Sequence, residues 1–505
     1  MKHKILFFVI LLSLLIMTVP FLLADSAGGK ELLFNGFLLN PLDGNSYLAK
    51  MQIGWEDNWI FKLPYTAEPG NGGYLFLFYI FLGHLSRWLN FPLLITFHLA
   101  RVLASIFLIV SIYVFCRNAF NASPSWARWS FLWIALGSGL GWLLFPFGLV
   151  TSDILVPEAY PLLSEIVNPH FPLGLGLMLW VFTWSGQSGV WPRLFTMVSG
   201  LALAVIQPFA VVIGGLVLAG MIPWQWMESK KLDWQPAFWF LLGGGPFLVY
   251  QFWISTTDPV LAGWNAQNLT PSPPLWDLVV SFSPALILAG LALVRFRKWQ
   301  LNYYQKISAI WLLSSLALIL VPFSLQRRFL TGFFIPVVIL ACIGVSQWAF
   351  APIKQRRLFT YAFTASIPTL LVILLIAAFG ISAKDGSLYR TAAEQEGFSW
   401  LVTNAPSNTI VLAAPSTGNL IPVYSGMRVL YGHPFETVNA ELMKSEVTNL
   451  FAGKLSAAES LKEIRDLQVK YVFFGPAEKQ LGSPAFLNQL QPVFSSSGVV
   501  IYAVD

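Results

Sequence analysis

The sequence predicts an α-helical polytopic membrane protein with about eleven spans and a small C-terminal α/β soluble domain. Of its 505 residues, 56% are hydrophobic and only 11% are charged, whereas about 25% of a soluble domain is charged. Apolar runs of about 17 to 25 residues alternate with short polar stretches, as a hydrocarbon layer about 30 Å thick requires of spanning helices. Residues 1–381 are therefore expected to form a transmembrane domain, and residues 382–505 a separate soluble one.

The first expected element is a retained span over Ile5 to Leu23. A cleavable signal peptide is the alternative, because Ala24-Asp25-Ser26-Ala27 offers small residues near a cleavage point, but the apolar run is long for such a peptide. Lys and Arg cluster in short loops, where the positive-inside rule makes them determinants of topology. This distribution predicts a cytoplasmic N-terminus and an extracytoplasmic C-terminal domain. The net charge of +6 accordingly indicates topology and no nucleic-acid partner.

Residues 25–91 are expected to form the first outer loop. It contains the polar stretch Asn40-Pro41-Leu42-Asp43-Gly44-Asn45-Ser46-Tyr47, in which Asp43 is a candidate catalytic carboxylate. A simple turn is the alternative for Asp43, because Asp and Asn favour turns. Residues 74–89 are rich in aromatic side chains and predict a helix, lying either on the membrane surface or across it.

The second outer loop is expected over residues 150–170, between an outward span at 129–147 and an inward span at 172–184. Asp153 and Glu158 are its candidate catalytic carboxylates, with His170 at the mouth of the following span. An ordinary carboxylate at a helix start is the alternative for Glu158. A structural histidine is the alternative for His170, although an ionisable group near membrane depth favours function.

Arg101 lies near the outer end of the span expected over residues 93–115. It is interpreted as either a cation that snorkels to the membrane surface or a contact for phosphate. The other spans are expected over 194–226 as two short helices that turn near Gln207 and Pro208, and over 234–253, 276–294, 307–321, 329–350 and 358–379.

Arg327 and Arg328 break the charge pattern, since they fall in an outer loop while nearly every other basic cluster is cytoplasmic. Guanidinium groups bind phosphate oxygens through paired hydrogen bonds. The pair is therefore a candidate anion site, with an interface anchor as the alternative.

In residues 382–505, short apolar runs alternate with amphipathic stretches, which favours an α/β arrangement. Strands are expected over 409–414, 429–431, 471–474 and 499–504, and helices over 440–451 and 457–467. The polar stretch Gly432-His433-Pro434-Phe435-Glu436 favours a turn, because Gly and Pro punctuate chains more often than they mark sites.

Three polar segments are thus expected on the outer face: the Asp43 loop, residues 153–170, and the Arg327-Arg328 turn. A carboxylate, an imidazole and two arginines at one interface can deprotonate a hydroxyl group while holding a phosphate leaving group. This chemistry requires no cofactor, and a divalent metal is compatible with it but not implied. Cys116 and Cys342 lie in or beside apolar segments and indicate neither a disulfide framework nor a metal site.

The Asp43 loop, the segment from Gly73 to Leu89 leading into Phe97-His98-Leu99-Ala100-Arg101, the acidic second loop and the soluble tail resemble the GT-C superfamily. These are polytopic glycosyltransferases that use polyprenyl-phosphate sugars, and they include the protein mannosyltransferases and the aminoarabinose transferases. The resemblance covers the whole chain in architecture. Protein mannosyltransferases carry an Asp-Glu pair in the first loop, whereas Asp43 is followed here by Gly44, which disfavours protein O-mannosylation.

The resemblance implies an inverting transfer of a hexosyl or pentosyl group from a lipid-phosphate sugar to an acceptor hydroxyl at the outer face of the plasma membrane. Asp43 would act as the base, assisted by Glu158 or Asp153. The substrate-binding residues would be Arg327, Arg328, Arg101, His170 and Tyr47. The expected partners are the polyprenyl-phosphate donor, the lipid bilayer and an acceptor that is a glycan, a lipid or a protein of the cell envelope.

Two other functions remain open at this point. A transporter or flippase of lipid-linked glycans would show Gly/Pro-interrupted helices in two related halves and charges near mid-membrane, whereas the charges here are expected at the outer face. A non-catalytic GT-C relative would keep the fold, and its function would not depend on the carboxylates.

Overall fold

The computed structural model describes residues 3–294, 300–347 and 351–504. The chain forms two compact units, each assembled from separate segments: the first from Met1–Pro20, His98–Tyr250 and Thr270–Ala378, the second from Phe21–Phe97, Gln251–Leu269 and Phe379–Asp505. The expected domain boundary at residues 381 and 382 stays a prediction. The last segment of the second unit begins close to it, at Phe379, but this unit also takes in most of the expected outer loop.

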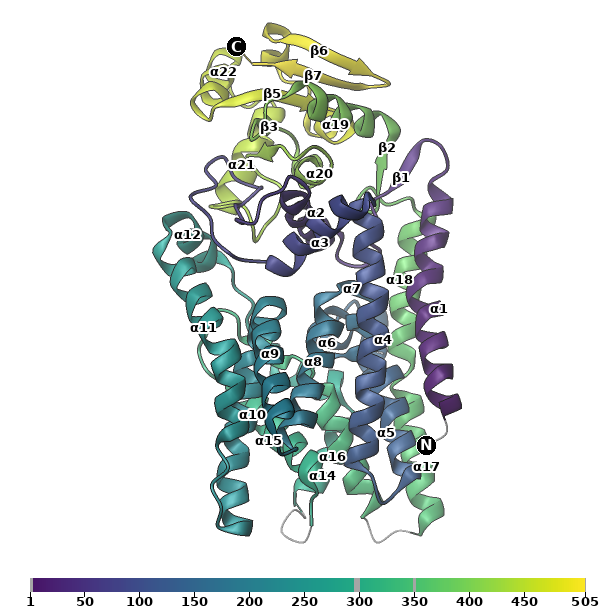
Figure 1. Cartoon of the computed structure of the whole chain (residues 1–505). Helices are drawn as coiled ribbons and strands as arrows, with labels where there is room; N and C mark the ends of the chain where they lie inside the picture. Colours follow the sequence, from purple (N-terminus) through teal and green to yellow (C-terminus); the bar gives the residue numbers. More distant parts are fainter. Residues whose placement is uncertain (1–2, 295–299, 348–350, 505) are drawn as a thin grey trace. The chain divides into compact units, whose positions relative to one another are not determined.

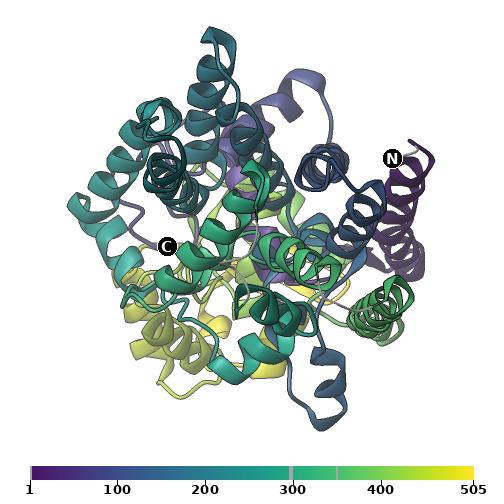
Figure 2. The same cartoon turned by 90° about the horizontal axis from the view of Figure 1, so that it is seen from below.

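The first unit is helical (Figure 1), and Figure 2 shows its helices from below, several of them nearly end-on. Its helices are α1 His3–Gly28, α4 Leu93–Ala119, α5 Pro124–Leu136, α6 Ser152–Leu155, α7 Pro161–Val167, α8 His170–Ser185, α9 Val190–Ile206, α10 Pro208–Ser229, α11 Gln235–Thr257, α13 Leu275–Phe282, α14 Ala285–Val294, α15 Tyr303–Leu318, α16 Phe334–Ser346, α17 Pro352–Ala365 and α18 Pro368–Ser382. Four of these helices, α1, α4, α11 and α18, continue into the second unit. Single 3-10 turns lie at η1 Gly141–Leu143, η2 Phe145–Phe147, η3 Pro157–Ala159 and η5 Gln326–Leu330.

Five stretches of described helix are long and apolar enough to cross a membrane, which makes the chain a multi-pass membrane protein. They are Lys4–Gly28, Leu93–Ala119, Pro208–Ser229, Gln235–Thr257 and Pro352–Ser382. Val190–Ile206 and Phe334–Ser346 are shorter apolar helices. The expected count of eleven spans stays a prediction, and the last three residues of the span expected over 329–350 lie outside the described residues.

The expected break at Gln207 is confirmed, because α9 ends at Ile206 and α10 begins at Pro208. The expected single helix over residues 129–147 is wrong. Helix α5 ends at Leu136, and η1 and η2 follow, because glycines at 137, 139 and 141 and Pro146 oppose a continuous helix.

Proline also interrupts two other expected spans. The span over 276–294 divides into α13 and α14 around Pro284, and the span over 358–379 divides between α17 and α18 just before Pro368. A proline lacks the backbone N–H that a helix interior needs and disfavours helical geometry in the residue before it.

The second unit combines helices with two sheets (Figure 1). Its helices are α2 Pro41–Trp55, α3 Leu77–Leu89, α12 Pro259–Gln267, α19 Ala392–Asn404, α20 Pro415–Ser425, α21 Ala440–Phe451, α22 Ala457–Asp466 and α23 Pro476–Leu481, with the 3-10 turn η6 Ala485–Gln489. The larger sheet has the order β4-β3-β5-β7-β6, with β3 Ile410–Leu412, β4 Arg428–Val429, β5 Val469–Phe474, β6 Gln491–Ser496 and β7 Val499–Ala503. Strand β3 is parallel to β4 and β5, while β7 is antiparallel to β5 and β6.

The four strands and two helices expected after residue 382 are confirmed. The strands β2 and β6 and the helices α19, α20 and α23 are additional. The smaller sheet pairs β1 Leu32–Phe34 with β2 Tyr389–Thr391 in antiparallel register. This pairing joins the N-terminal part of the unit to its C-terminal part, although more than 350 residues of chain separate them.

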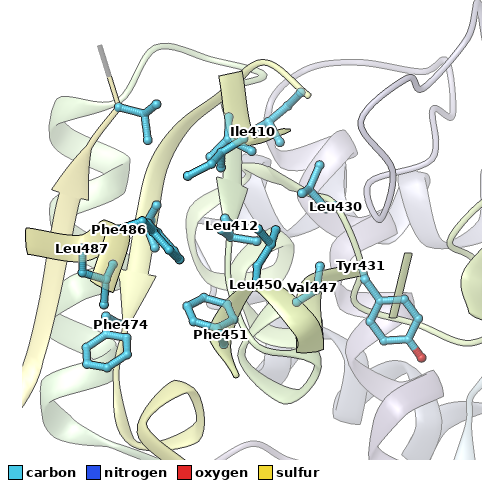
Figure 3. Close-up of a cluster of buried hydrophobic side chains, with 14 of the residues drawn as sticks. Ile410, Leu412, Leu430, Tyr431, Val447, Leu450, Phe451, Phe474, Phe486 and Leu487 are labelled. Atoms are coloured by element: carbon cyan, nitrogen blue, oxygen red, sulfur yellow. The ribbon is translucent and has the colours of Figure 1, made fainter. Parts of the chain in front are cut away.

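A hydrophobic cluster fills the space between the larger sheet and its helices (Figure 3). It contains Ile410 and Leu412 from β3, Phe474 from β5, and Leu450 and Phe451 from α21. Leu430 and Tyr431, which follow β4, belong to the same cluster. The cluster therefore fixes the chain directly before the polar segment 432–437.

Helices α2 and α3 pack backbone against backbone. A Cβ atom added at Gly83 would lie 1.9 Å from the carbonyl oxygen of Met51, so a larger residue would separate the helices. Helix α3 has 13 residues, or about 20 Å at 1.5 Å per residue. Because this is too short to span the membrane, and because Phe81, Trp88 and Leu89 are exposed on it, the surface-helix alternative is favoured.

Candidate functional site

Asp43 lies in the first turn of α2, so the expected polar loop over residues 40–47 is wrong beyond Asn40. Asn40 adopts the left-handed conformation, and Pro41 follows as the first helical residue. Proline suits that position because its fixed φ is already helical and its missing N–H is not needed there. A carboxylate in the first turn is also stabilised by the helix dipole, so the residues that suggested a turn instead start a helix.

Two side chains hold the Asp43 carboxylate. The amide nitrogen of Asn40 donates to Oδ2, and Nε2 of His433 lies 3.1 Å from Oδ1. The Asp43 side chain is 36% exposed, while that of His433 is 3% exposed. The carboxylate is therefore oriented from one side and open to solvent on the other.

A buried ion pair lies two turns further along the same face of α2, since residues three or four apart in a helix are neighbours. The Lys50 ammonium lies 2.5 Å from Oε1 of Glu436, and its side chain is fully buried. The Ser46 hydroxyl donates to the same oxygen at 2.5 Å. Burial by itself raises the pKa of Glu436, but the Lys50 charge, the neighbouring His433 and the hydrogen bonds from Lys50 and Ser46 together outweigh it, so its net pKa lies below the ordinary value.

Tyr47 packs within this part of the second unit. Its ring stacks on that of Tyr79 with centroids 4.2 Å apart and planes 17° apart, and Nζ of Lys50 lies 5.0 Å from the Tyr47 ring. These contacts explain the position of the ring structurally. The expected role of Tyr47 in substrate binding stays a prediction.

In the first unit, Glu158 lies between Arg327 and Arg328. Glu158 belongs to η3 and the arginines to η5, and a backbone hydrogen bond of 2.8 Å from Gly332 to Glu158 ties the two turns together. Oε1 of Glu158 lies 3.6 Å from Nε of Arg327 and 3.3 Å from Nη1 of Arg328. The structure thus brings together three residues that the sequence analysis placed in one site.

This trio of Glu158, Arg327 and Arg328 carries a net charge of +1, because one carboxylate faces two guanidinium groups. The Glu158 side chain is 1% exposed, whereas those of Arg327 and Arg328 are 32% and 28% exposed. The carboxylate therefore cannot reach a substrate, while the arginines can. Guanidinium groups held in this way suit a phosphate oxygen.

Asp153 is fully buried, and its carboxylate accepts hydrogen bonds from neutral donors. These include the backbone N–H of Gly141 at 2.9 Å and the hydroxyls of Thr151, Thr369 and Ser281 at 2.6, 2.9 and 3.3 Å. In this arrangement Asp153 secures the turn that follows α5. Its expected catalytic role stays a prediction that this geometry does not support.

Arg101 is buried as well, so the snorkelling alternative is wrong. Its guanidinium donates to the carbonyl oxygens of Met17, Glu165 and Ile166 at 3.0 to 3.1 Å, which directs much of its hydrogen-bonding capacity to the backbone. His170 begins α8 and is nearly buried, with its ring 3.9 Å from that of Phe171. The phosphate and substrate contacts expected of these two residues stay predictions.

Lys50, His433 and Glu436 are partners within this site that were not predicted from the sequence. His433 and Glu436 stood in a stretch interpreted as a turn, and Lys50 was one charge among several in an expected loop. The i, i+3 and i, i+7 spacing of Asp43, Ser46 and Lys50 is the signal that would have placed them on one helix face.

Within residues 3–294, 300–347 and 351–504, no group of three or more His, Cys, Asp or Glu side chains is arranged to hold a metal ion. The expectation that the chemistry requires no metal or other cofactor stays a prediction.

The arrangement of helices and sheets is the fold of the GT-C glycosyltransferases. The chain is similar to the oligosaccharyltransferase of Archaeoglobus fulgidus tethered to an acceptor peptide, with a TM-score of 0.59, 12% identity and coverage of 100% of this chain and 74% of that one. It is also similar to ArnT from Cupriavidus metallidurans bound to undecaprenyl phosphate, with a TM-score of 0.51, 11% identity and coverage of 97% and 98%. For the arabinofuranosyltransferase AftD from Mycobacteria, the TM-score is 0.55 at 15% identity, and the chain covers only 40% of that protein. No protein-family model and no curated protein sequence matches the chain, so the likeness is one of fold.

Proposed function

We propose that this protein is a membrane glycosyltransferase that moves a sugar from a polyprenyl-phosphate donor to an acceptor hydroxyl at the outer face of the plasma membrane. The observation that carries the proposal is the Asp43 carboxylate, which is oriented by two side chains at the start of α2 and open to solvent. A general base needs both a fixed geometry and access to the proton it removes.

In the proposed reaction the acceptor oxygen attacks the anomeric carbon of the donor, and the bond between that carbon and the phosphate oxygen breaks. The acceptor proton passes to Asp43, and the bonding electrons leave with the polyprenyl phosphate. A single in-line displacement of this kind inverts the anomeric configuration. The sugar is a hexose or a pentose, and the acceptor is a glycan, a lipid or a protein.

We assign the departing phosphate to Arg327 and Arg328, with Glu158 as the carboxylate that keeps the two guanidinium groups in place. Preorganised cations stabilise charge that develops on a leaving group without reorganising during the reaction. A lipid-phosphate donor is also in keeping with the dolichol phosphate bound to the Archaeoglobus oligosaccharyltransferase and the undecaprenyl phosphate bound to ArnT.

A transfer assay tests the proposal. Purified protein in lipid is incubated with radiolabelled polyprenyl-phosphate sugars and a crude envelope acceptor fraction, and wild type is compared with D43N. We expect the label transferred by D43N to fall by about 10²- to 10⁴-fold, the usual contribution of a general base. Equal transfer by the two proteins would remove Asp43 from the mechanism.

The proposed orientation is tested separately with L269C, a change at an exposed residue that follows α12. Both native cysteines are buried and free, so they give little background labelling. An impermeant thiol reagent added outside intact cells is expected to label L269C. Labelling only after the membrane is opened would contradict the outer placement of this segment.

A further inference from the structure

We infer that His433 is a positioning residue for the proposed reaction: its neutral imidazole donates Nε2–H to Asp43 and holds that carboxylate ionised and correctly oriented. The inference rests on the proposed function, and it makes a residue of the C-terminal part of the chain a component of the Asp43 site. The two side chains are 390 residues apart in the sequence.

The hydrogen bonds fix the tautomer of His433. The backbone N–H of Phe435 donates to Nδ1 at 3.2 Å, so Nδ1 must keep its lone pair. The ring proton then resides on Nε2, which lies 3.1 Å from Oδ1 of Asp43. In the opposite tautomer, Nδ1–H would face the Phe435 N–H, and Nε2 would present a lone pair to a carboxylate oxygen.

The backbone around His433 leaves the ring little freedom. Thr437 closes the segment, since its N–H donates to the carbonyl oxygen of His433 at 3.0 Å while its hydroxyl accepts from the His433 N–H at 3.3 Å. A Cβ atom added at the preceding Gly432 would lie 2.4 Å from the carbonyl oxygen of Gly418. Before it, Tyr431 is anchored in the hydrophobic cluster of Figure 3.

The other ionisable groups near this carboxylate do not compete for the role. Burial, followed by the charges of Glu436 and Asp43, raises the pKa of Tyr65 well above its ordinary value, so Tyr65 stays a neutral phenol. Its hydroxyl donates to the carbonyl oxygen of Asn419 at 3.2 Å. Lys50 and Glu436 are paired with each other at 2.5 Å.

His433 therefore acts on Asp43 through a hydrogen bond and not as a second base. During transfer the acceptor proton goes to Asp43, and the imidazole keeps its own proton on Nε2. Hydrogen bonds to a carboxylate favour its charged form. Loss of the His433 donor should thus leave a smaller fraction of ionised Asp43 at a given acidic pH.

Three variants of His433 distinguish a positioning role of its side chain from a purely structural role. Gln carries an amide N–H that can replace Nε2–H, whereas the shorter Asn places its amide near Nδ1, and Ala has no donor. We expect H433A and H433N to lower kcat by about 10- to 100-fold, as the loss of a hydrogen bond to a charged group implies. The acidic limb of the pH–rate profile should move to higher pH, KM for the lipid donor should stay unchanged, and H433Q should recover most of the rate.

H84Q is the matched control, because His84 is also buried in the second unit but its ring nitrogens lie beside Asp57 and the carbonyl oxygen of Asn58 instead of Asp43. It should keep the wild-type pH profile. If wild type is active and D43N is inactive while H433A keeps the wild-type rate and profile, the inference fails and the proposed function stands. If wild type transfers no label from any donor, the proposed function fails first.

A measurement independent of activity checks the tautomer. Nitrogen NMR of ¹⁵N-histidine-labelled protein distinguishes protonated from unprotonated ring nitrogens, and the signals missing from H433Q identify His433. We expect a protonated Nε2 and an unprotonated Nδ1 at neutral pH. A proton on Nδ1 would overturn the inference whatever the transfer assay gives.

Discussion

Asp43 in the second unit and Glu158 in the first are both carboxylates held by named partners, yet they are held in opposite ways. Asp43 accepts hydrogen bonds from Asn40 and the neutral His433 and is 36% exposed. Glu158 faces two guanidinium groups and is 1% exposed. An exposed carboxylate with neutral donors can exchange protons with a substrate, whereas a buried one between two cations can only position them.

This difference shows that an acidic residue in the sequence is a poor guide to a catalytic role unless the partners of its carboxylate are known. Glu158 directly follows a proline and Asp43 lies two residues beyond one, and both lie in the first turn of a helical segment. Their surroundings separate them: Asp43 is partly exposed, whereas Glu158 is buried between two cations.

The largest effect outside catalysis is expected at the ion pair beside Asp43. E436Q leaves the fully buried Lys50 ammonium without its counter-charge, and breaking a buried pair from one side costs about 3–5 kcal/mol. Thermal unfolding in detergent should therefore show a markedly lower midpoint for E436Q. E441Q, at an exposed position of α21, is the control, and identical midpoints for the two variants would mean that the pair does not hold the segment.

A smaller effect is expected from the arginines of the first unit. R328A removes charge-assisted hydrogen bonds worth about 1.5–3 kcal/mol, so its affinity for polyprenyl phosphate should fall by about 10- to 100-fold. D43N should bind the same lipid phosphate about as well as wild type. Equilibrium binding of polyprenyl phosphate to detergent-solubilised protein checks both affinities. A markedly lower affinity of D43N, or an unchanged affinity of R328A, would contradict the assignment of phosphate binding to the arginines and not to Asp43.

R328K refines the same point. Lysine keeps the charge but cannot make paired, planar hydrogen bonds to a phosphate, so the loss of affinity should lie between those of wild type and R328A. An affinity of R328K equal to that of wild type would show that the phosphate needs only a positive charge at this position.

The smallest effect concerns pH. The folded pKa of Glu436 lies below its ordinary value of 4.5, so its stabilising contribution is fully present above that value. This contribution is lost as the pH falls through the lower folded pKa. The unfolding midpoint of wild type should consequently fall more steeply over this acidic window than that of E436Q, and parallel curves would show that Glu436 does not contribute.

Composition and charge pattern were sufficient to predict a multi-pass helical protein, and short apolar runs predicted four of the five strands after residue 409, because burial in lipid or in a sheet leaves strong periodic signals. Strand β6 was missed. The same signals failed over residues 129–147, where hydropathy continues but glycine and proline end the helix at Leu136. Hydropathy reports burial and does not report backbone geometry. The N-terminal half of the second unit was missed as well, since the β1–β2 pairing depends on residues far apart in the chain.

The candidate site was predictable where oppositely charged residues have an evident electrostatic reason to lie close together. Arg327 and Arg328 were out of place in an outer loop, and Glu158 is the carboxylate that compensates them. His433 was not predictable in this way, because its partner lies 390 residues earlier and an imidazole beside proline gives no local signal of its role. Arg101 and Asp153 were selected for their charge, but backbone and hydroxyl groups account for them.

The separation of Asp43 and His433 in the sequence also means that the two residues are synthesised at different times. At a synthesis rate of about 5–20 residues per second, the ribosome needs about 20–80 s to proceed from one residue to the other. During that interval the membrane helices after α2 are synthesised, and Asp43 has no hydrogen bond from His433. The contact between Asp43 and His433 therefore forms only after the last of the five long apolar helices, which ends at Ser382, has been made.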